Sequence, residues 1–261
     1  MLADAGHNLS DVAGLLVAWG GLKAVELAPD ARHTYGWKRA SILAAFINAV
    51  LLLLAMGALG WEAVQRLGQD SVPDGWTIIW VAGIGVVINT ATALLFLRGQ
   101  EDLNIRGAFL HMAADALVSV GVVVSGILAL VFAWGWLDPL LSLIIAAIIV
   151  IGTWGLFRQS LHLLFDGVPA GIALDEVQAY FTALPGVEQV HDLHVWALGT
   201  SETALTVHLL IPGGVQDDTL LARIAEDLQT RFNISHPTVQ IEHAPRSCGC
   251  AQGFIASDDP A

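Results

Sequence analysis

The chain has 261 residues, of which 55% are hydrophobic and only 13% are charged, with a mean hydropathy of +0.65. This balance is too apolar for an ordinary soluble domain and indicates an integral membrane protein. The formal net charge of -13 argues against nucleic acid as a partner. The cysteines, Cys248 and Cys250, are too few and too close together to stabilise a fold by disulfide bonds.

Five apolar segments are long enough to cross a bilayer of about 30 Å, which requires roughly 20 helical residues. They lie near residues 2–27, 41–64, 76–97, 107–134 and 137–164. Basic residues gather in the connections after the first and third segments and at the end of the last one. By the positive-inside rule, these connections and everything after residue 165 are cytoplasmic.

Two of these segments carry a histidine and an aspartate four residues apart: His7 with Asp11, and His111 with Asp115. Residues at this spacing share one face of a helix, and ionisable groups at membrane depth are rarely kept without a function. Two neutral imidazoles and two carboxylates balance the charge of a divalent cation, and this set of four nitrogen and oxygen ligands suits zinc. The four residues are therefore candidate ligands of one transported ion.

From Pro169 onward the pattern changes to short amphipathic and alternating segments, which predicts a small soluble domain. The expected order is a helix over 175–184, strands over 187–198 and 203–211, a helix over 217–232 and a strand over 238–243. These elements give an α+β layer with the helices on one face of the sheet. We therefore divide the chain into a transmembrane domain (1–167), a cytoplasmic α+β domain (168–246) and a flexible tail (247–261).

Four further motifs accompany the two histidine and aspartate pairs, in the order His33–Arg39, Asp138-Pro139, Asp166–Pro169 and Val190–Trp196. Together they resemble the cation diffusion facilitator family of proton-coupled zinc exporters. The resemblance implies a multi-pass α-helical membrane protein with a C-terminal cytoplasmic α+β domain of metallochaperone-like fold. Because such proteins have six spans, and the two pairs belong to the second and fifth, the first span is expected to be missing from this sequence.

The resemblance also implies a function and partners. The chain is expected to be an antiporter rather than an enzyme, exporting Zn2+ from the cytoplasm in exchange for H+. His7, Asp11, His111 and Asp115 are expected to hold the ion near mid-membrane. The remaining expectations are a homodimer and a location in the bacterial cytoplasmic membrane, with the lipid bilayer and a divalent metal ion as partners.

Three further metal sites are implied by the same resemblance. One regulatory site consists of His191, His208 and Glu242, and a second of His236 with Cys248 and Cys250. A weak loop site would use Asp30 and His33, although Trp37 stands where such members have a third ligand, so packing of the loop is the alternative. His162 and His194 are interpreted as structural.

Two other functional classes remain open from the residues alone. An intramembrane zinc hydrolase would use the same ligands, but it requires a glutamate base directly after the first histidine, where this chain has Asn8 and Met112. A membrane-anchored metal-sensing module is the third possibility, suggested by the soluble domain.

Overall fold

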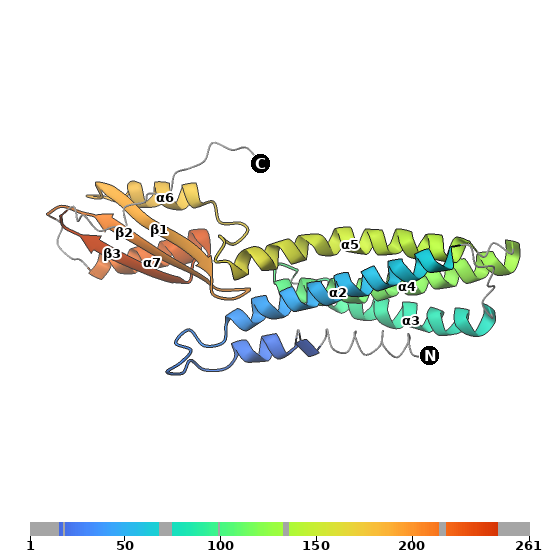
Figure 1. Ribbon diagram of the computed structural model, residues 1–261. Coiled ribbons are helices and arrows are strands. Elements are labelled where there is room, and N and C mark those ends of the chain that lie inside the picture. The colour runs from blue at the N-terminus through green and yellow to red at the C-terminus, as the bar shows by residue number, and fades with distance from the viewer. Residues whose placement is uncertain are drawn as a thin grey trace. The chain divides into compact units, whose positions relative to one another are not determined.

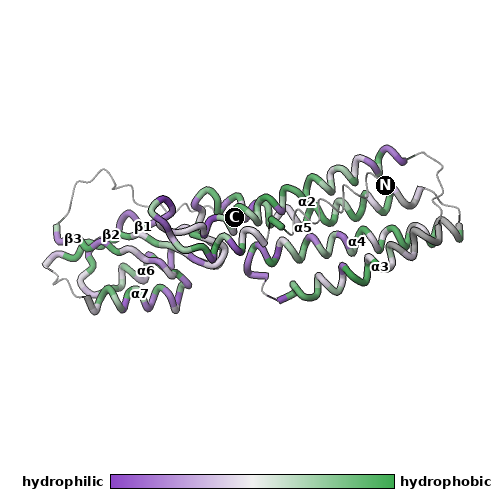
Figure 2. The backbone as a smooth tube through the Cα atoms, turned by 90° about the horizontal axis from the view of Figure 1, so that it is seen from below, coloured by the Kyte–Doolittle hydropathy of each residue, from purple (hydrophilic) through white to green (hydrophobic). Residues whose placement is uncertain are grey.

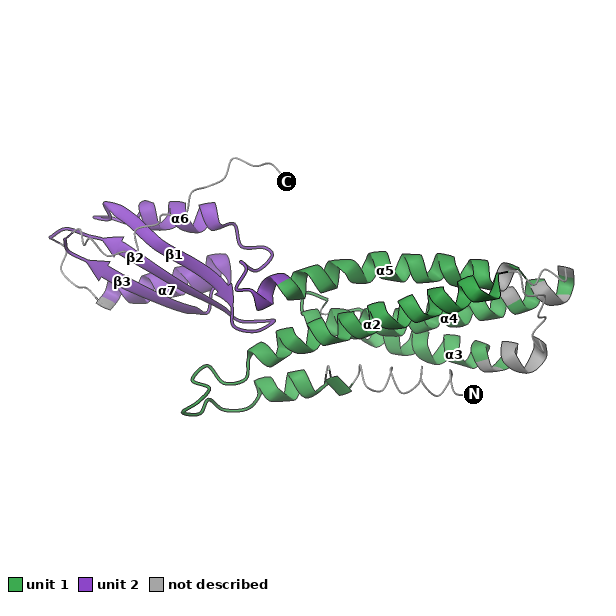
Figure 3. Ribbon diagram, in the orientation of Figure 1, with its two compact units in different colours: residues 1–161 green, residues 162–261 purple. Residues whose placement is uncertain are grey.

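The computed structural model describes residues 16–17, 19–67, 75–98, 100–132, 136–213 and 218–244. The chain divides into two compact units, residues 1–161 and 162–261 (Figure 3). The first is built from long helices, and the second combines a small sheet with two short helices (Figure 1).

The long helices are α2 (Arg39–Arg66), α3 (Gly75–Leu95), α4 (Leu103–Phe132) and α5 (Leu137–Leu164). Among the residues that the structure describes, three stretches are long and apolar enough to cross a membrane: Arg39–Arg66, Leu103–Leu128 and Pro139–Leu164. In α3 a shorter apolar stretch covers Ala82–Leu95. Most of the first predicted span, near residues 2–27, lies outside the described residues, and residues 19–25 of it are helical.

These helices expose large apolar side chains and bury polar ones, the reverse of a soluble bundle. Leu54 of α2 and Ile151 and Trp154 of α5 are more than half exposed. Figure 2 colours the backbone by the hydropathy of each residue, and most of α2 to α5 is hydrophobic there. The buried polar residues of the same helices are Ser41, Asn48, Asn104, His111, Asp115, Thr153 and Ser160. An apolar exterior around polar interior groups is what a lipid solvent requires.

Helices α4 and α5 run antiparallel, with side chains of each facing glycines of the other. Leu156 lies against Gly107, Leu110 against Gly152, and Ile145 against Gly121. Among the described residues, α4 makes its most extensive helix contact with α3. Helix α2 joins them through the rings of Phe46 and Phe157, whose centroids are 5.4 Å apart.

The second unit contains α6 (Leu174–Thr182), β1 (Gln189–Ala197), β2 (Thr203–Leu210), α7 (Asp218–Phe232) and β3 (His236–Glu242). The sheet order is β1-β2-β3, with β1 antiparallel and β3 parallel to β2. The last strand begins two residues earlier than the sequence predicts, because Pro237 can occupy a strand that has a neighbour on one side only.

Both short helices cover the same face of this sheet. Phe181 of α6 and Ile224 and Leu228 of α7 form one buried cluster with Leu205, Val207 and Leu209, the alternate residues of β2. Asp175 and Glu176 stabilise the start of α6 through the helix dipole, and Asn233, in the left-handed conformation with φ 55°, follows the end of α7. The pleat therefore directs the intervening residues of β2, Thr206 and His208, to the opposite face.

Candidate metal centres

The described half of the predicted transport site lies on α4. His111 and Asp115 are 4% and 6% exposed, and His111 Nε2 lies 3.7 Å from Asp115 Oδ2. Around the next turn, Ala114 packs against Leu52 and Met56 of α2 and Ile149 of α5. The two ligand candidates are thus held inside the helix bundle, shielded from lipid. Their predicted counterparts, His7 and Asp11, lie outside the described residues.

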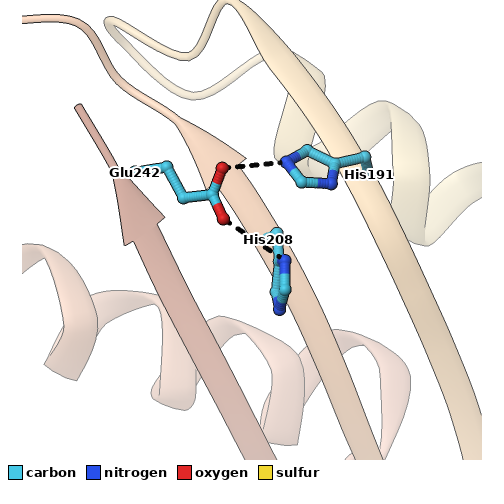
Figure 4. Close-up of side chains that lie close together, drawn as sticks. All are labelled: His191, His208 and Glu242. Atoms are coloured by element: carbon cyan, nitrogen blue, oxygen red, sulfur yellow. Dashed lines mark hydrogen bonds and ion pairs between the residues drawn. The ribbon is translucent and has the colours of Figure 1, made fainter. Parts of the chain in front are cut away.

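The soluble unit brings together His191, His208 and Glu242, one from each strand (Figure 4). The carboxylate reaches both imidazoles, with Glu242 Oε2 at 3.3 Å from His191 Nε2 and Oε1 at 3.5 Å from His208 Nδ1. One ligand atom from each of the three residues lies within 4.8 Å of the others. Two nitrogens and one carboxylate oxygen form a set that zinc accepts.

Strand pairing explains how the two imidazoles meet. His191 and His208 are directly opposite each other in the antiparallel ladder of β1 and β2, and their rings are 5.1 Å apart at 85°. Glu242 pairs with Leu210 in the parallel ladder, so it reaches the histidines diagonally. All three side chains are at most 18% exposed, on the face of the sheet opposite the helices.

The carboxyl of Glu242 is held in its charged form. Burial on its own raises the pKa of Glu242, but the hydrogen bond from the Gln240 amide, 2.8 Å from Oε1, and the neighbouring imidazoles outweigh burial and lower it. A metal ligand must be deprotonated. The surroundings of Glu242 therefore already favour the form that binds a cation.

Asp192 contacts the same cluster, and the sequence analysis missed it as a functional residue. The β1–β2 register shifts between His191 and His194, and Asp192 takes a left-handed conformation with φ 53° at that point. Its carboxylate then lies 3.6 Å from His208 Nε2 and 3.1 Å from His194 Nε2. At 3.6 Å the contact with His208 is longer than a hydrogen bond, so Asp192 adds negative charge beside the cluster. The Val190–Trp196 motif contains this aspartate, but the irregularity that aims it is not visible in the pattern.

In the predicted loop site, the Asp30 carboxylate bonds to backbone N–H groups of the loop. Asp30 Oδ1 accepts hydrogen bonds from the N–H groups of Arg32 and His33, each at 2.7 Å. These bonds, that of His33 first, lower the pKa of Asp30. The His33 ring also lies 4.1 Å from the Trp37 ring. Both side chains therefore serve the shape of the loop.

The residues of the second predicted regulatory site are only partly described. His236 is exposed at the start of β3, opposite Ala204 of β2. Cys248 and Cys250 lie outside the described residues, as does the predicted tail. The two histidines interpreted as structural differ: His162 Nε2 bonds the carbonyl of Val168 at 3.1 Å, whereas His194 is 64% exposed and contacts Asp192.

Comparison with known proteins places the chain in a family. Residues 1–165 match the profile described as the cation efflux transmembrane domain, and residues 169–244 match the cation efflux protein cytoplasmic domain. The chain belongs to the cation efflux family. The expected resemblance to cation diffusion facilitators is confirmed, as is the expected fold class, a multi-pass helical membrane protein with a C-terminal cytoplasmic α+β domain.

Several relatives of this cation efflux protein are bacterial transporters. The zinc transporter ZitB of Pectobacterium atrosepticum is 35% identical over 246 residues, which cover 93% of this chain and 77% of that protein. A cadmium, cobalt and zinc/H(+)-K(+) antiporter of Bacillus subtilis is 33% identical over 248 residues, covering 93% and 79%. The CzcD metal cation efflux protein of Cupriavidus metallidurans is 34% identical over 260 residues, covering 98% and 82%.

A solved structure, the metal-bound C-terminal domain of the CzcD transporter of Cupriavidus metallidurans, is 38% identical, covers 27% of this chain and 99% of that one, and has a TM-score of 0.26. Membership of the family confirms that the chain is a membrane transporter rather than an enzyme. It also confirms that the C-terminal domain is cytoplasmic.

Proposed function

We propose that this cation efflux protein exports zinc from the cytoplasm in exchange for protons, through a site formed by His7, Asp11, His111 and Asp115. The observation that carries the proposal is the buried pair His111 and Asp115 on α4, inside a unit whose exterior is apolar. Ionisable groups at membrane depth are costly to bury and typically mark ion pathways. Relatives named as zinc transporters support zinc as the ion.

Competition between metal and protons gives the coupling. Zinc requires neutral imidazole and ionised carboxylate, so a proton on any of the four groups weakens metal binding, and metal binding releases protons. A site facing the cytoplasm loads zinc, and the same site facing a more acidic exterior takes up protons and releases it. The relative named as a zinc/H(+)-K(+) antiporter supports this exchange.

The cytoplasmic domain is proposed to dimerise and to regulate transport by binding zinc at His191, His208 and Glu242. The geometry that supports this site is the meeting of its three ligand atoms within 4.8 Å. His236 with Cys248 and Cys250 stays a second candidate site, whereas Asp30 and His33 are assigned a role in loop structure. We place the dimer in the bacterial cytoplasmic membrane, since the relatives come from bacteria.

Reconstituted vesicles containing a zinc-sensitive dye test the transport function. For molecules whose cytoplasmic face points outward, an acidic interior should accelerate zinc entry, and a protonophore should remove this acceleration. The apparent zinc affinity should weaken as the pH of the bath falls through the range in which free imidazole titrates, near a pKa of about 6.5. Flux that ignores the gradient, with an affinity that stays flat from about pH 5.5 to 8, would contradict proton exchange.

A further inference from the structure

A line of polar groups leads along α4 to the proposed transport site. Asn104, His111 and Asp115 are seven and then four residues apart, so on a helix they fall within about 40° of one another. Asn104 precedes His111 by about 10 Å along the axis. All three side chains are buried, with Asn104 only 2% exposed.

Asn48 of α2 fills the gap between Asn104 and His111. A Cβ atom on Gly107, one turn before His111, would lie 2.8 Å from Asn48 Nδ2, so the absence of a side chain at position 107 makes room for the amide. Asn48 is also 2% exposed. The two asparagines, from two helices, thus lie at successive positions along the axis of α4, both before His111.

The oxygens of these two amides are not used to hold the helices together. Within the described part of the chain, Asn48 Oδ1 and both polar side-chain atoms of Asn104 have no hydrogen-bond partner. Ser160, equally buried in α5, bonds instead to the carbonyls of Leu156 and Phe157 in its own helix. A buried amide without a partner is costly and implies an occupant such as water or an ion.

The line begins at the cytoplasmic side. Helix α5 continues into the cytoplasmic domain, and α4 is antiparallel to α5, so the first residue of α4, Leu103, lies at the cytoplasmic end. Asp102 is immediately before it, and its Oδ1 accepts the N–H groups of Asn104 and Ile105 at 2.8 and 3.2 Å. A carboxylate at this end of α4 attracts cations.

We propose that the side-chain oxygens of Asn104 and Asn48 form a relay that passes a partly dehydrated divalent cation from the cytoplasmic end of α4 to His111 and Asp115. The relay rests on the proposed function of that pair. Amide oxygens can replace water around a divalent cation, but being neutral they hold zinc weakly. Weak intermediate sites admit an ion without trapping it, whereas buried carboxylates at the same levels would compete with the final site.

The test compares two replacements of Asn104 in the full-length protein. Asn104→Leu keeps the branched shape and the number of side-chain heavy atoms but removes the oxygen, and Asn104→Asp keeps the oxygen in the same shape. Ser160→Ala is the matched control, because it removes a buried hydroxyl that bonds only its own helix. For each variant, the rate of zinc loading is measured in vesicles by stopped flow, and the equilibrium affinity for zinc is measured in detergent on the same folded preparation.

A relay predicts that Asn104→Leu slows zinc loading by about three- to tenfold, the effect of one neutral polar contact, while the equilibrium affinity stays within about twofold. Asn48→Ala should act in the same direction, and Asn104→Asp should load faster than Asn104→Leu. Ser160→Ala should match the parent protein.

Three results would overturn the relay. Unchanged loading in Asn104→Leu would show that the oxygen is not needed, and an affinity that falls as much as the rate would make the amide a ligand of the final site. Equal loss in the Leu and Asp variants would make the amide N–H groups, which both variants lack, the important feature. A parent protein that moves no zinc at all would instead remove the proposed function itself.

Discussion

His111 Nε2 and Asp115 Oδ2 lie 3.7 Å apart on successive turns of α4, with side chains only 5% and 7% exposed. This separation is longer than a hydrogen bond. It is close to the spacing of two ligands that hold one tetrahedral zinc ion at about 2.0–2.2 Å each. The pair is therefore placed as neighbouring ligands would be, without a large change in either side chain.

Asp115→Ala should abolish zinc flux. The variant lacks one ligand, and the site with zinc bound carries one positive charge too many for a buried position. Flux in vesicles at saturating zinc is the measurement, with dimer formation followed by size-exclusion chromatography. Glu62→Ala is the control, since Glu62 is a half-exposed carboxylate of the same unit that pairs with Arg66. Undiminished flux in Asp115→Ala would remove Asp115 from the site.

In the cytoplasmic domain, His208→Ala combined with Glu242→Ala should reduce the zinc bound per chain without unfolding residues 168–261. Two of the three clustered ligands are lost, whereas the apolar core on the other face of the sheet is untouched. Calorimetric titration gives the stoichiometry. His243→Ala is the control, because the His243 ring bonds the carbonyl of Ile211. The same stoichiometry in the double variant and the control would refute this site.

The lowered pKa of Glu242 predicts an acid dependence of stability in the zinc-free domain. A carboxyl whose pKa is lowered by folding stabilises the fold above its unfolded pKa, about 4.3 for glutamate, and this stabilisation is lost as pH falls through the folded value. The excess stability of the parent domain over Glu242→Gln should therefore shrink from about pH 5 downward. Urea unfolding at several pH values measures it. A difference that stays constant down to about pH 3 would mean that the carboxylate is not stabilised by folding.

Tyr180→Phe should destabilise the cytoplasmic domain by about 1–2 kcal/mol, the value of a half-buried hydrogen bond to a carboxylate. The Tyr180 hydroxyl donates to Asp227 Oδ2 at 2.8 Å, between α6 and α7. Burial, followed by this bond, raises the pKa of Tyr180, so the stabilisation persists at neutral pH and is lost only under strongly alkaline conditions. Thermal or urea unfolding measures the loss.

A double variant provides the control for this bond. If Tyr180 and Asp227 stabilise the domain through each other, Asp227→Asn should have little further effect once Tyr180→Phe is present. Fully additive effects would assign the loss to packing instead.

The sequence predicted those features that depend on composition along one helix or strand. The apolar runs located α2 to α5 within a few residues, and the four-residue spacing placed His111 and Asp115 on one face of α4. The hairpin of β1 and β2 similarly follows from two alternating strands and a short turn. These features are local, so periodicity is sufficient to find them.

Features that depend on contacts between distant segments were not visible in the pattern. Asn48 and Asn104 stand singly in their segments and have no telling spacing, and their alignment needs the packing of α2 on α4 at Gly107. Asp192 was missed because its direction comes from a register shift and a left-handed residue within β1. The early start of β3 at His236 likewise depends on its position at the edge of the sheet.

The cluster in the cytoplasmic domain joins His191 to Glu242, which is 51 residues further along the chain, across a parallel crossover through α7. A chain emerging from the ribosome therefore presents both imidazoles of the hairpin well before the carboxylate. Until β3 has been synthesised and docked beside β2, zinc finds at most two of the three ligands. Zinc capture at this proposed centre would therefore require the completed domain.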